Sequence, residues 1–252
     1  MCIITGAANG IGFATAQKIS NEGGIAVICD INLEKVNLAV DAINQMGGRA
    51  EGYAMNVTDR PSVDAVVADL MAKHGHIDVL INNAGLALGL EPAHQAFLSD
   101  WDRMIDTNIK GLVHMSRAFL PGMVERKCGH VINLGSVAAN YPYPGGNVYG
   151  GTKAFVKQFS LNLRADLIGT PVRVTCIEPG MCAGTEFSNV RFKGDDDKAS
   201  KVYTGVKALS ADDVAEAIYW SATLPSHMNI NVLELMPVQQ AFNAFNIHRG
   251  EL

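Results

Sequence analysis

Two hydrophobic periods alternate along most of the chain. Short runs that are apolar at nearly every position predict strands buried on both faces of a sheet, at residues 2–5, 25–30, 50–55, 77–82, 130–134 and 172–177, with a last strand near 231–235. The segments between them have apolar residues at helical spacing and predict helices at 11–21, 33–46, 62–74, 101–125, 149–167 and 211–222. Strands that alternate with helices predict βαβ units. We therefore expect an α/β fold with a doubly wound parallel sheet.

The chain shows no internal change of composition that would mark a linker, so we expect a single domain over residues 1–252. Two stretches interrupt the alternation. Residues 141–146 are rich in proline and glycine, and residues 181–206 follow the sixth predicted strand without a clear period. Structureless loops of such length are usually functional or mobile.

Charge and composition exclude several classes of partner. The formal net charge is -5 and no cluster of Lys and Arg is present, so we expect neither a nucleic-acid partner nor a membrane partner. No apolar run approaches the roughly 18 residues that span a bilayer. The first residues lack the basic start of a signal peptide. The cysteines are odd in number and scattered, which indicates free thiols in a reducing cytoplasm rather than disulfides or metal ligands, and the histidines form no metal motif.

A glycine-rich turn at residues 5–12, Thr-Gly-Ala-Ala-Asn-Gly-Ile-Gly, follows the first strand and opens the first helix. Glycine lets a phosphate approach the backbone, and the free N–H groups at a helix start attract its charge. The alternative is an ordinary glycine turn, but the strand–turn–helix context favours a dinucleotide site of the Rossmann type. The residues expected to contact the cofactor here are Gly6, Asn9, Gly10, Ile11 and Gly12.

Asp30 ends the second predicted strand. A carboxylate at this place can accept hydrogen bonds from the adenosine ribose hydroxyls and would repel a 2′-phosphate. The neighbours Asn9, Ile31 and Asn32 are not basic. We therefore expect NAD as the cofactor, with NADP less favoured; the alternative is that Asp30 only caps the next helix.

The candidate chemistry lies in Ser136, Tyr149 and Lys153. Tyr149 and Lys153 are four positions apart, so they share one face of a helix, and Ser136 ends the strand before it. Oxidation of an alcohol needs a base for the hydroxyl proton, and a free tyrosine, with a pKa of about 10, is too weakly acidic for this role. A lysine ammonium about 4–5 Å away would favour the phenolate by around 3–4 kcal/mol. Ser136 would stabilise the charge that develops on the substrate oxygen.

Taken together, these motifs and the Asn-Asn-Ala-Gly turn at residues 82–85 resemble the short-chain dehydrogenase/reductase family in its form of roughly 250 residues. The resemblance implies that Tyr149 is the acid/base, that Lys153 lowers its pKa and holds the ribose, that Ser136 orients the substrate, and that Asn108 holds a water in a proton relay. It also implies a substrate lid at about 181–206. The further cofactor contacts that it implies are Ile31, Asn56, Val57, Asn83, Ala84, Gly85, Tyr149, Lys153, Pro179, Gly180 and Thr185.

Residues 82–89, 121–126 and 184–194 are similar to the 3-hydroxy acid dehydrogenases of this family, which act on serine, allo-threonine and 3-hydroxypropionate-like acids, generally with NADP. The chain departs from them at Asp30 and Asn56. The resemblance implies a small 3-hydroxy acid that contacts Ser136 and Tyr149. Its carboxylate requires a cation, and Arg191 is favoured over Lys193 and Arg249 because its planar fork can donate two parallel hydrogen bonds. Alternatively, Arg191 is solvated or pairs with the aspartates at 195–197.

Other functions remain open at this point. The chain could be a nucleotide-binding regulatory protein of the same fold without turnover, or a dehydrogenase or reductase for an uncharged alcohol or ketone. An epimerase or dehydratase of the longer related family would need an added C-terminal substrate domain. The resemblance also implies a homotetramer, with a dimer as the alternative, in which the helices at 101–125 and 149–167 pack between copies. The apolar Phe242, Phe245 and Ile247 follow the last predicted strand and need burial, which a subunit boundary would provide.

Overall fold

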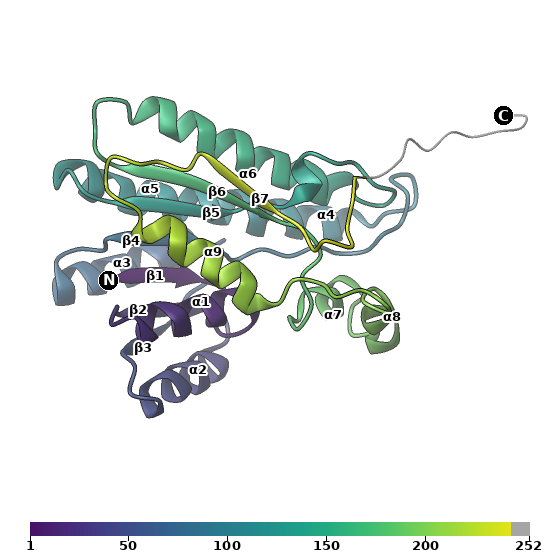
Figure 1. Cartoon of the computed structure of the whole chain (residues 1–252), viewed down its shortest axis with the longest axis horizontal. Helices are drawn as coiled ribbons and strands as arrows, with labels where there is room; N and C mark the ends of the chain where they lie inside the picture. The colour runs from purple at the N-terminus through teal and green to yellow at the C-terminus, as the bar shows by residue number, and fades with distance from the viewer. Residues whose placement is uncertain (243–252) are drawn as a thin grey trace, which may run out of the picture.

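Seven strands, all parallel, form one sheet in the computed structural model, which describes residues 1–242 (Figure 1). Their order in the sheet is β3-β2-β1-β4-β5-β6-β7. The strands are β1 (Cys2–Thr5), β2 (Ala26–Asp30), β3 (Ala50–Ala54), β4 (Val79–Asn82), β5 (His130–Leu134), β6 (Arg173–Pro179) and β7 (Val232–Leu235). Each predicted strand is present, with its ends within two residues of the prediction.

Helices cover both faces of the sheet, as the continuous apolar runs predict. Successive strand residues point to opposite faces, so Ile3 and Ile4 of β1 enter two different hydrophobic clusters. The layer on the Ile4 face consists of α1 (Gly10–Asn21), α2 (Leu33–Gln45) and α9 (Ala211–Thr223). The layer on the Ile3 face is built mainly from α3 (Arg60–His74), α5 (Leu112–Glu125) and α6 (Asn147–Asp166). Figure 1 shows α6 and α9 on opposite sides of the strands.

The chain order reverses between β1 and β4, which are neighbours in the sheet but not in the sequence. In such sheets the helices that leave adjacent strands pass to opposite faces, which opens a crevice at the carboxyl ends of the strands. The glycine turn after β1 and the turn after β4 both lie at this crevice. The doubly wound Rossmann-type fold predicted from the sequence is confirmed.

The longest predicted helix is more irregular than its sequence pattern indicates. Residues 98–125 form α4 (Leu98–Ile105), a π-helical segment η1 (Asp106–Gly111) and α5, where one helix was predicted over 101–125. Gly111 lies where any Cβ would be 2.6 Å from Cγ2 of Val57, so the helix passes very close to the segment after β3. π-helical turns often occur at functional sites, and Asn108 lies within this one.

The segment at 181–206 is not structureless. It contains two short helices, α7 (Phe187–Arg191) and α8 (Asp196–Lys201), and α8 is capped by Asp195, whose carboxylate accepts from the backbone N–H of Lys198 at 3.0 Å. Helices of five or six residues are too short to show a helical hydrophobic period, which explains why the sequence did not reveal them.

Of the three apolar C-terminal residues predicted to be covered, Phe242 lies within the described residues. Phe242 is 65% exposed, and its ring lies 4.6 Å from that of Tyr141. Phe245, Ile247 and Arg249 lie outside the described residues. Among residues 1–242, no helix combines the length and the apolar character needed to cross a membrane.

Candidate active site

A cleft of about 560 Å³ opens at the carboxyl edge of the sheet, between the glycine turn, the ends of β4, β5 and β6, and the segment that holds α7 and α8. Most of the residues singled out from the sequence line it: Gly6, Asn9, Gly10, Ile11, Asp30, Asn83, Ala84, Gly85, Ser136, Tyr149, Lys153, Pro179, Gly180, Thr185 and Arg191. The fold thus gathers residues that are far apart in the sequence into one site.

Five predicted site residues lie away from the cleft surface. Gly12 packs against the carbonyl of Gly6, which a Cβ would approach to 2.6 Å, so its role is close packing. Ile31 is 71% exposed. Asn56 closes a turn by accepting from the N–H of Thr58 at 3.0 Å, and Val57 is buried against the π-helical segment. Asn108 is buried behind the catalytic helix.

The glycine turn is held open by contacts with the β4 turn. Gly6 and Gly10 have φ values of +62° and +54°, a conformation that favours glycine. The hydroxyl of Thr5 accepts from the N–H groups of Asn83 and Ala84 at 3.1 and 3.0 Å. The Asn83 side chain in turn donates to the Thr5 and Gly6 carbonyls, both at 2.9 Å. Thr5 is therefore a positioning residue that the sequence analysis missed; the signal was a lone polar residue at the end of an apolar strand.

The catalytic candidates converge on the floor of the cleft. Tyr149 and Lys153 lie on the buried face of α6, and Lys153 Nζ donates to the carbonyl of Leu134 at 2.7 Å. Lys153 Nζ is 5.9 Å from the centre of the Tyr149 ring. Ser136 lies two residues after the end of β5, and its hydroxyl accepts from the N–H of Ala138 at 3.1 Å. The three residues, which are separated in the sequence, thus lie together in one cluster.

Burial is the largest influence on the pKa values of Tyr149 and Lys153 in this cluster. It raises the pKa of Tyr149 to about 12, against which a hydrogen bond with Ser136 and the charge of Arg191 act to lower it. Burial also lowers the pKa of Lys153 to about 8. The sequence predicts that Lys153 lowers the pKa of Tyr149. In the structure, Lys153 Nζ is directed to the β5 carbonyl and is itself desolvated, while Ser136 and Arg191 act beside it to lower the tyrosine pKa.

Asn108 has its side-chain donors and acceptor engaged by protein groups. Its Oδ1 accepts from the N–H of Leu86 at 2.9 Å, while Nδ2 donates to the Leu86 carbonyl at 2.9 Å and to the Thr152 hydroxyl at 3.0 Å. Thr152 then donates to the carbonyl of Tyr149 at 2.8 Å. These bonds connect the π-helical segment to the turn after β4 and to the helix that carries Tyr149.

Arg191, at the end of α7, faces the catalytic residues. The carbon of its guanidinium lies 5.2 Å from the centre of the Tyr149 ring and 4.9 Å from that of Phe187. One terminal nitrogen donates to the Tyr143 hydroxyl at 3.1 Å, and Nε is buried without a hydrogen-bond partner. Arg191 does not pair with the aspartates at 195–197: Asp195 pairs with Lys198, and Asp196 accepts from Asn189.

Several cleft residues were not predicted. They are mainly aromatic and apolar side chains from segments without a strong periodic pattern: Tyr141, Tyr143, Phe187, Val202, Tyr203, Met236 and Gln240. For Tyr141 and Tyr143 the sequence did offer a signal, because two tyrosines stand in the proline-rich loop between β5 and α6. The remaining residues of this set reach the cleft only through the path of the chain after β6 and β7.

A doubly wound sheet whose crevice holds a glycine turn together with Ser, Tyr and Lys defines a nucleotide-dependent oxidoreductase. The comparisons agree: the model of the short chain dehydrogenase family matches residues 1–196, and the chain belongs to that family. It is 53% identical over 247 residues to "NADP-dependent 3-hydroxy acid dehydrogenase YdfG" of Shigella flexneri, covering 98% of each chain. It is 50% identical to "Serine 3-dehydrogenase" of Rhizobium radiobacter, covering 98% of this chain and 97% of that one.

A solved structure of the closed form of serine dehydrogenase complexed with NADP+ superposes with a TM-score of 0.96, at 52% identity and with 99% of each chain covered. This similarity covers the whole fold and includes the segment at 181–206. The similarity to 3-hydroxy acid dehydrogenases noted in the sequence is therefore confirmed.

The expected preference for NAD over NADP is contradicted by these relatives. The Shigella protein is named NADP-dependent, and the superposed structure holds NADP+. The expectation depended on Asp30 and on the absence of a basic residue at Asn9, Ile31 and Asn32. Asp30 is also engaged by the backbone. Its two carboxylate oxygens are within hydrogen-bond distance of the N–H groups of Ala8 (3.4 Å) and Asn32 (3.3 Å). A cation, Lys35, also stands in the first turn of α2, where the sequence analysis had considered only residues adjacent to Asp30.

Proposed function

We propose that this protein transfers a hydride between NADP(H) and a small 3-hydroxy acid, such as serine or 3-hydroxypropionate. The family supports an oxidoreductase acting on a hydroxyl group, and the names of the relatives support the substrate class and the cofactor. The observation in the structure that supports the acid substrate best is the placement of Arg191 against Tyr149.

The cleft suits a dinucleotide. Gly6 and Gly10 bring the backbone to its surface, and the first turn of α1 has no side-chain cap on its N–H groups, which leaves these donors available to a pyrophosphate. Lys153 would hold the nicotinamide ribose. Lys35, which stands in the first turn of α2 and pairs with Glu186 of the cleft, would supply a cation for the 2′-phosphate beyond Asp30. When bound, the oxidised nicotinamide supplies a hydride acceptor and a positive charge.

The protein supplies the base and the positioning groups. Tyr149 accepts the hydroxyl proton of the substrate during oxidation and returns it during reduction. Because burial raises its pKa to about 12, the phenolate needs positive charge and hydrogen bonds to form near neutral pH. Ser136 donates to the substrate oxygen and holds it in place, and Asn108 fixes the helix that carries Tyr149.

Arg191 would bind the carboxylate of the substrate. Its aromatic surroundings exclude water from the planar faces of the guanidinium, and its unpartnered Nε is a buried donor, which is costly unless a ligand accepts from it. A carboxylate can accept two parallel hydrogen bonds from such a fork. In a 3-hydroxy acid the carboxylate carbon is two positions from the reacting carbon, so Arg191 would hold one end of a small substrate while Ser136 and Tyr149 hold the other.

Replacing Arg191 with methionine tests this role. A charge-assisted hydrogen bond contributes about 1.5–3 kcal/mol. We therefore expect kcat/KM for serine and 3-hydroxypropionate to fall at least about tenfold. An uncharged alcohol of similar size should lose clearly less than the acids: it has no carboxylate to bind and shares only the loss that follows from the effect of the arginine charge on the pKa of Tyr149.

Lys193→Met is the matched control. Lys193 is a cation of the same segment, but it pairs with Asp100 at 2.8 Å and lies over the Phe97 ring, outside the cleft lining. Its loss should affect charged and uncharged substrates equally. An equal loss on both substrate classes for Arg191→Met would remove the arginine from the substrate site. Absence of turnover by the wild-type protein on any 3-hydroxy acid would refute the proposed substrate class.

A further inference from the structure

The turn that carries Ser136 ends in a polar residue outside the cleft lining, Asn140. The turn is the single-turn helix η2 (Val137–Ala139). Ser136 caps it: its hydroxyl accepts from Ala138, and its carbonyl accepts from Ala139 at 2.9 Å. Asn140 closes the same turn by donating its N–H to Val137 at 3.0 Å. Ser136 and Asn140 are thus the two ends of one short rigid unit.

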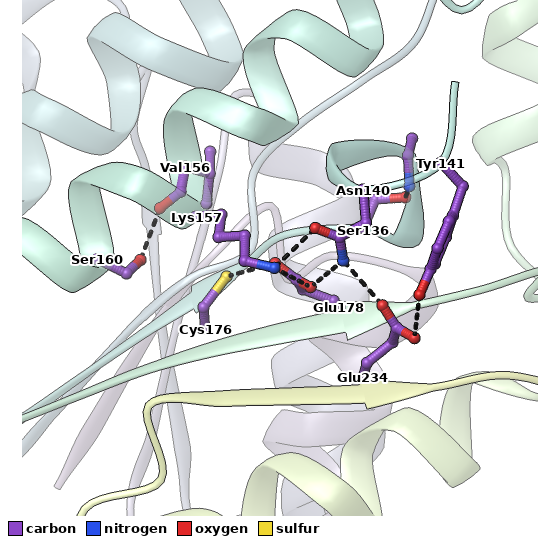
Figure 2. A network of polar contacts seen from close by, with 10 residues as sticks. Ser136, Asn140, Tyr141, Val156, Lys157, Ser160, Cys176, Glu178 and Glu234 are labelled. Carbon is purple, nitrogen blue, oxygen red and sulfur yellow. Dashed lines mark hydrogen bonds and ion pairs between the residues drawn. The ribbon is translucent and has the colours of Figure 1, made fainter. Parts of the chain in front are cut away.

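The side chain of Asn140 anchors this unit to three other elements (Figure 2). Its Nδ2 donates to Glu178 of β6 at 2.7 Å and to Glu234 of β7 at 2.8 Å. Its Oδ1 accepts from Lys157 of α6 at 2.7 Å. Both amide hydrogens are used, so a single amide group joins the Ser136 turn to two strands and to the catalytic helix.

Glu178 makes this anchor stiff because its side chain is completely buried. Besides Asn140, the carboxylate contacts Lys157 Nζ at 3.4 Å and the Cys176 thiol at 3.7 Å. A buried carboxylate that loses a donor is strongly destabilised, so its partners are held in a narrow range of positions. Lys157 lies one helical turn after Lys153 and two after Tyr149, so the network is fixed to the same helix face as the proposed base.

We propose that Asn140 is a positioning residue that fixes the hydroxyl of Ser136 relative to Tyr149. This inference rests on the proposed function, in which Ser136 and Tyr149 act on the substrate oxygen. It assigns a role in the reaction to a network that does not itself touch the substrate. Glu178 and Lys157 hold the amide, and the amide holds the turn.

The consequence for the chemistry concerns the pKa of Tyr149, which the hydrogen bond with Ser136 lowers. If the turn moves, this bond weakens and the phenolate becomes harder to form, so the pKa of Tyr149 rises. Oxidation uses the phenolate, and its rate should then increase only at higher pH. Lys153 on the same helix, Arg191 from α7 and Tyr143 from the preceding loop also face Tyr149 and would be unchanged.

Asn140→Ala tests the proposal without changing a charge. In the holoenzyme we expect kcat for oxidation to fall about tenfold, its rise with pH to move upward by at least half a pH unit, and KM for NADP to stay within about twofold. Hydrogen–deuterium exchange of a peptide covering 135–141 should be at least tenfold faster, with the α6 and β6 peptides unchanged. A residue that contributed only to stability would alter neither the pH profile nor exchange confined to this turn.

Glu234→Gln is the control on the same amide. It keeps one acceptor oxygen for Asn140 and removes an exposed charge together with the carboxylate oxygen that accepts from the Tyr141 hydroxyl at 3.1 Å. Activity should match the wild type within about twofold, and exchange of the turn should rise far less than in Asn140→Ala. If Asn140→Ala does not fold because Glu178 is left without its donor, the double variant Asn140→Ala/Glu178→Met removes that carboxylate as well. The double variant should fold and still show the upward pH shift and the faster exchange.

The proposal is overturned if a folded Asn140 variant keeps the wild-type pH profile and the wild-type exchange of residues 135–141. It is also overturned if exchange accelerates while the pH profile stays fixed, because the turn would then not control Tyr149. Wild-type failure to oxidise any hydroxy acid is a different result: it removes the proposed function and with it any effect on catalysis. The exchange data would still report whether Asn140 holds the turn.

Discussion

The floor of the cleft and the segment above it are held by different kinds of contact. On the floor, Lys153 donates to a buried carbonyl and Asn108 bonds to the backbone of Leu86, with both side chains at least nine-tenths buried. Above the cleft, Glu186 pairs with Lys35 at 2.8 Å and accepts from Asn9 at 2.8 Å, and all these contacts are exposed. Buried polar contacts tolerate little displacement, whereas an exposed ion pair contributes about 0–1 kcal/mol.

This difference in contacts agrees with the different roles proposed for the two regions. In the proposed reaction the floor carries the groups that take part in proton transfer, and its contacts are costly to break. The upper segment, at 181–206, carries Arg191 and lies beside the glycine turn, and its weaker contacts would suit a segment that opens and closes for ligand exchange. The predictions below change one region at a time.

The largest effect is expected on the floor, from Tyr149→Phe. Loss of a general acid/base typically lowers turnover about 10²–10⁴-fold. We expect kcat to fall at least about a hundredfold, while the dissociation constant for NADP, measured by fluorescence titration, changes less than about threefold. Near-normal turnover in this variant would place the base elsewhere.

The sheet beneath the floor should make the protein sensitive to acid through His130. Burial lowers the pKa of this histidine from 6.5 to about 3, so the unfolded chain binds a proton that the folded chain does not. Stability is then complete above pH 6.5 and is lost as the pH falls from 6.5 toward 3. Between pH 7 and pH 5 this group alone costs about 2 kcal/mol in the free energy of unfolding.

Urea unfolding at the two pH values measures this loss. His130→Gln can still bond to the hydroxyl of Thr175, which lies 2.8 Å from His130 Nε2, and it does not titrate. The variant should therefore lose about 2 kcal/mol less between pH 7 and pH 5 than the wild type. An identical pH dependence in the two proteins would show that His130 is already protonated in the folded state or exposed.

The smallest effect is expected above the cleft, from Glu186→Gln. The change removes the ion pair with Lys35 but keeps an acceptor for Asn9. The loss of the pair loosens the segment but also frees Lys35 for the 2′-phosphate, so we expect the rate of NADP dissociation in stopped-flow displacement to change by no more than about fivefold. The kcat for a slow substrate should be unchanged, and added salt should reduce the difference. A loss as large as that of Tyr149→Phe would mean that the contrast between the two regions is wrong.

The regions also differ in how far the sequence predicted them. The strands were predictable because burial on both faces of the sheet leaves continuous apolar runs in the sequence, as at 25–30. The glycine turn was predictable because Gly6 and Gly10 stand between a strand and a helix. The cluster of Ser136, Tyr149 and Lys153 was predictable since a strand end and one helix face bring them together. The helices α7 and α8 were not, because five or six residues cannot show a period.

Electrostatic detail was predicted least well. The sequence could not show that Lys153 Nζ is directed to the Leu134 carbonyl. Nor could it show that Arg191, which is distant from Tyr149 in the sequence, lies over the ring of Tyr149 in the fold. The cofactor preference failed for a related reason. It was judged from Asp30 and its neighbours, whereas charged groups further along the chain, such as Lys35 in the next helix and Glu186 in the segment after β6, come close to this end of the cleft only in the fold.

The most direct test of the account is the rate of NADP reduction by the wild-type protein with serine and 3-hydroxypropionate, each compared with an uncharged alcohol of the same carbon length. The account predicts NADPH formation with both acids and a kcat/KM at least about tenfold higher than for the uncharged alcohols, because only the acids offer a carboxylate to Arg191. NADPH formation with the uncharged alcohols alone, or no reduction with any of these substrates, would contradict it.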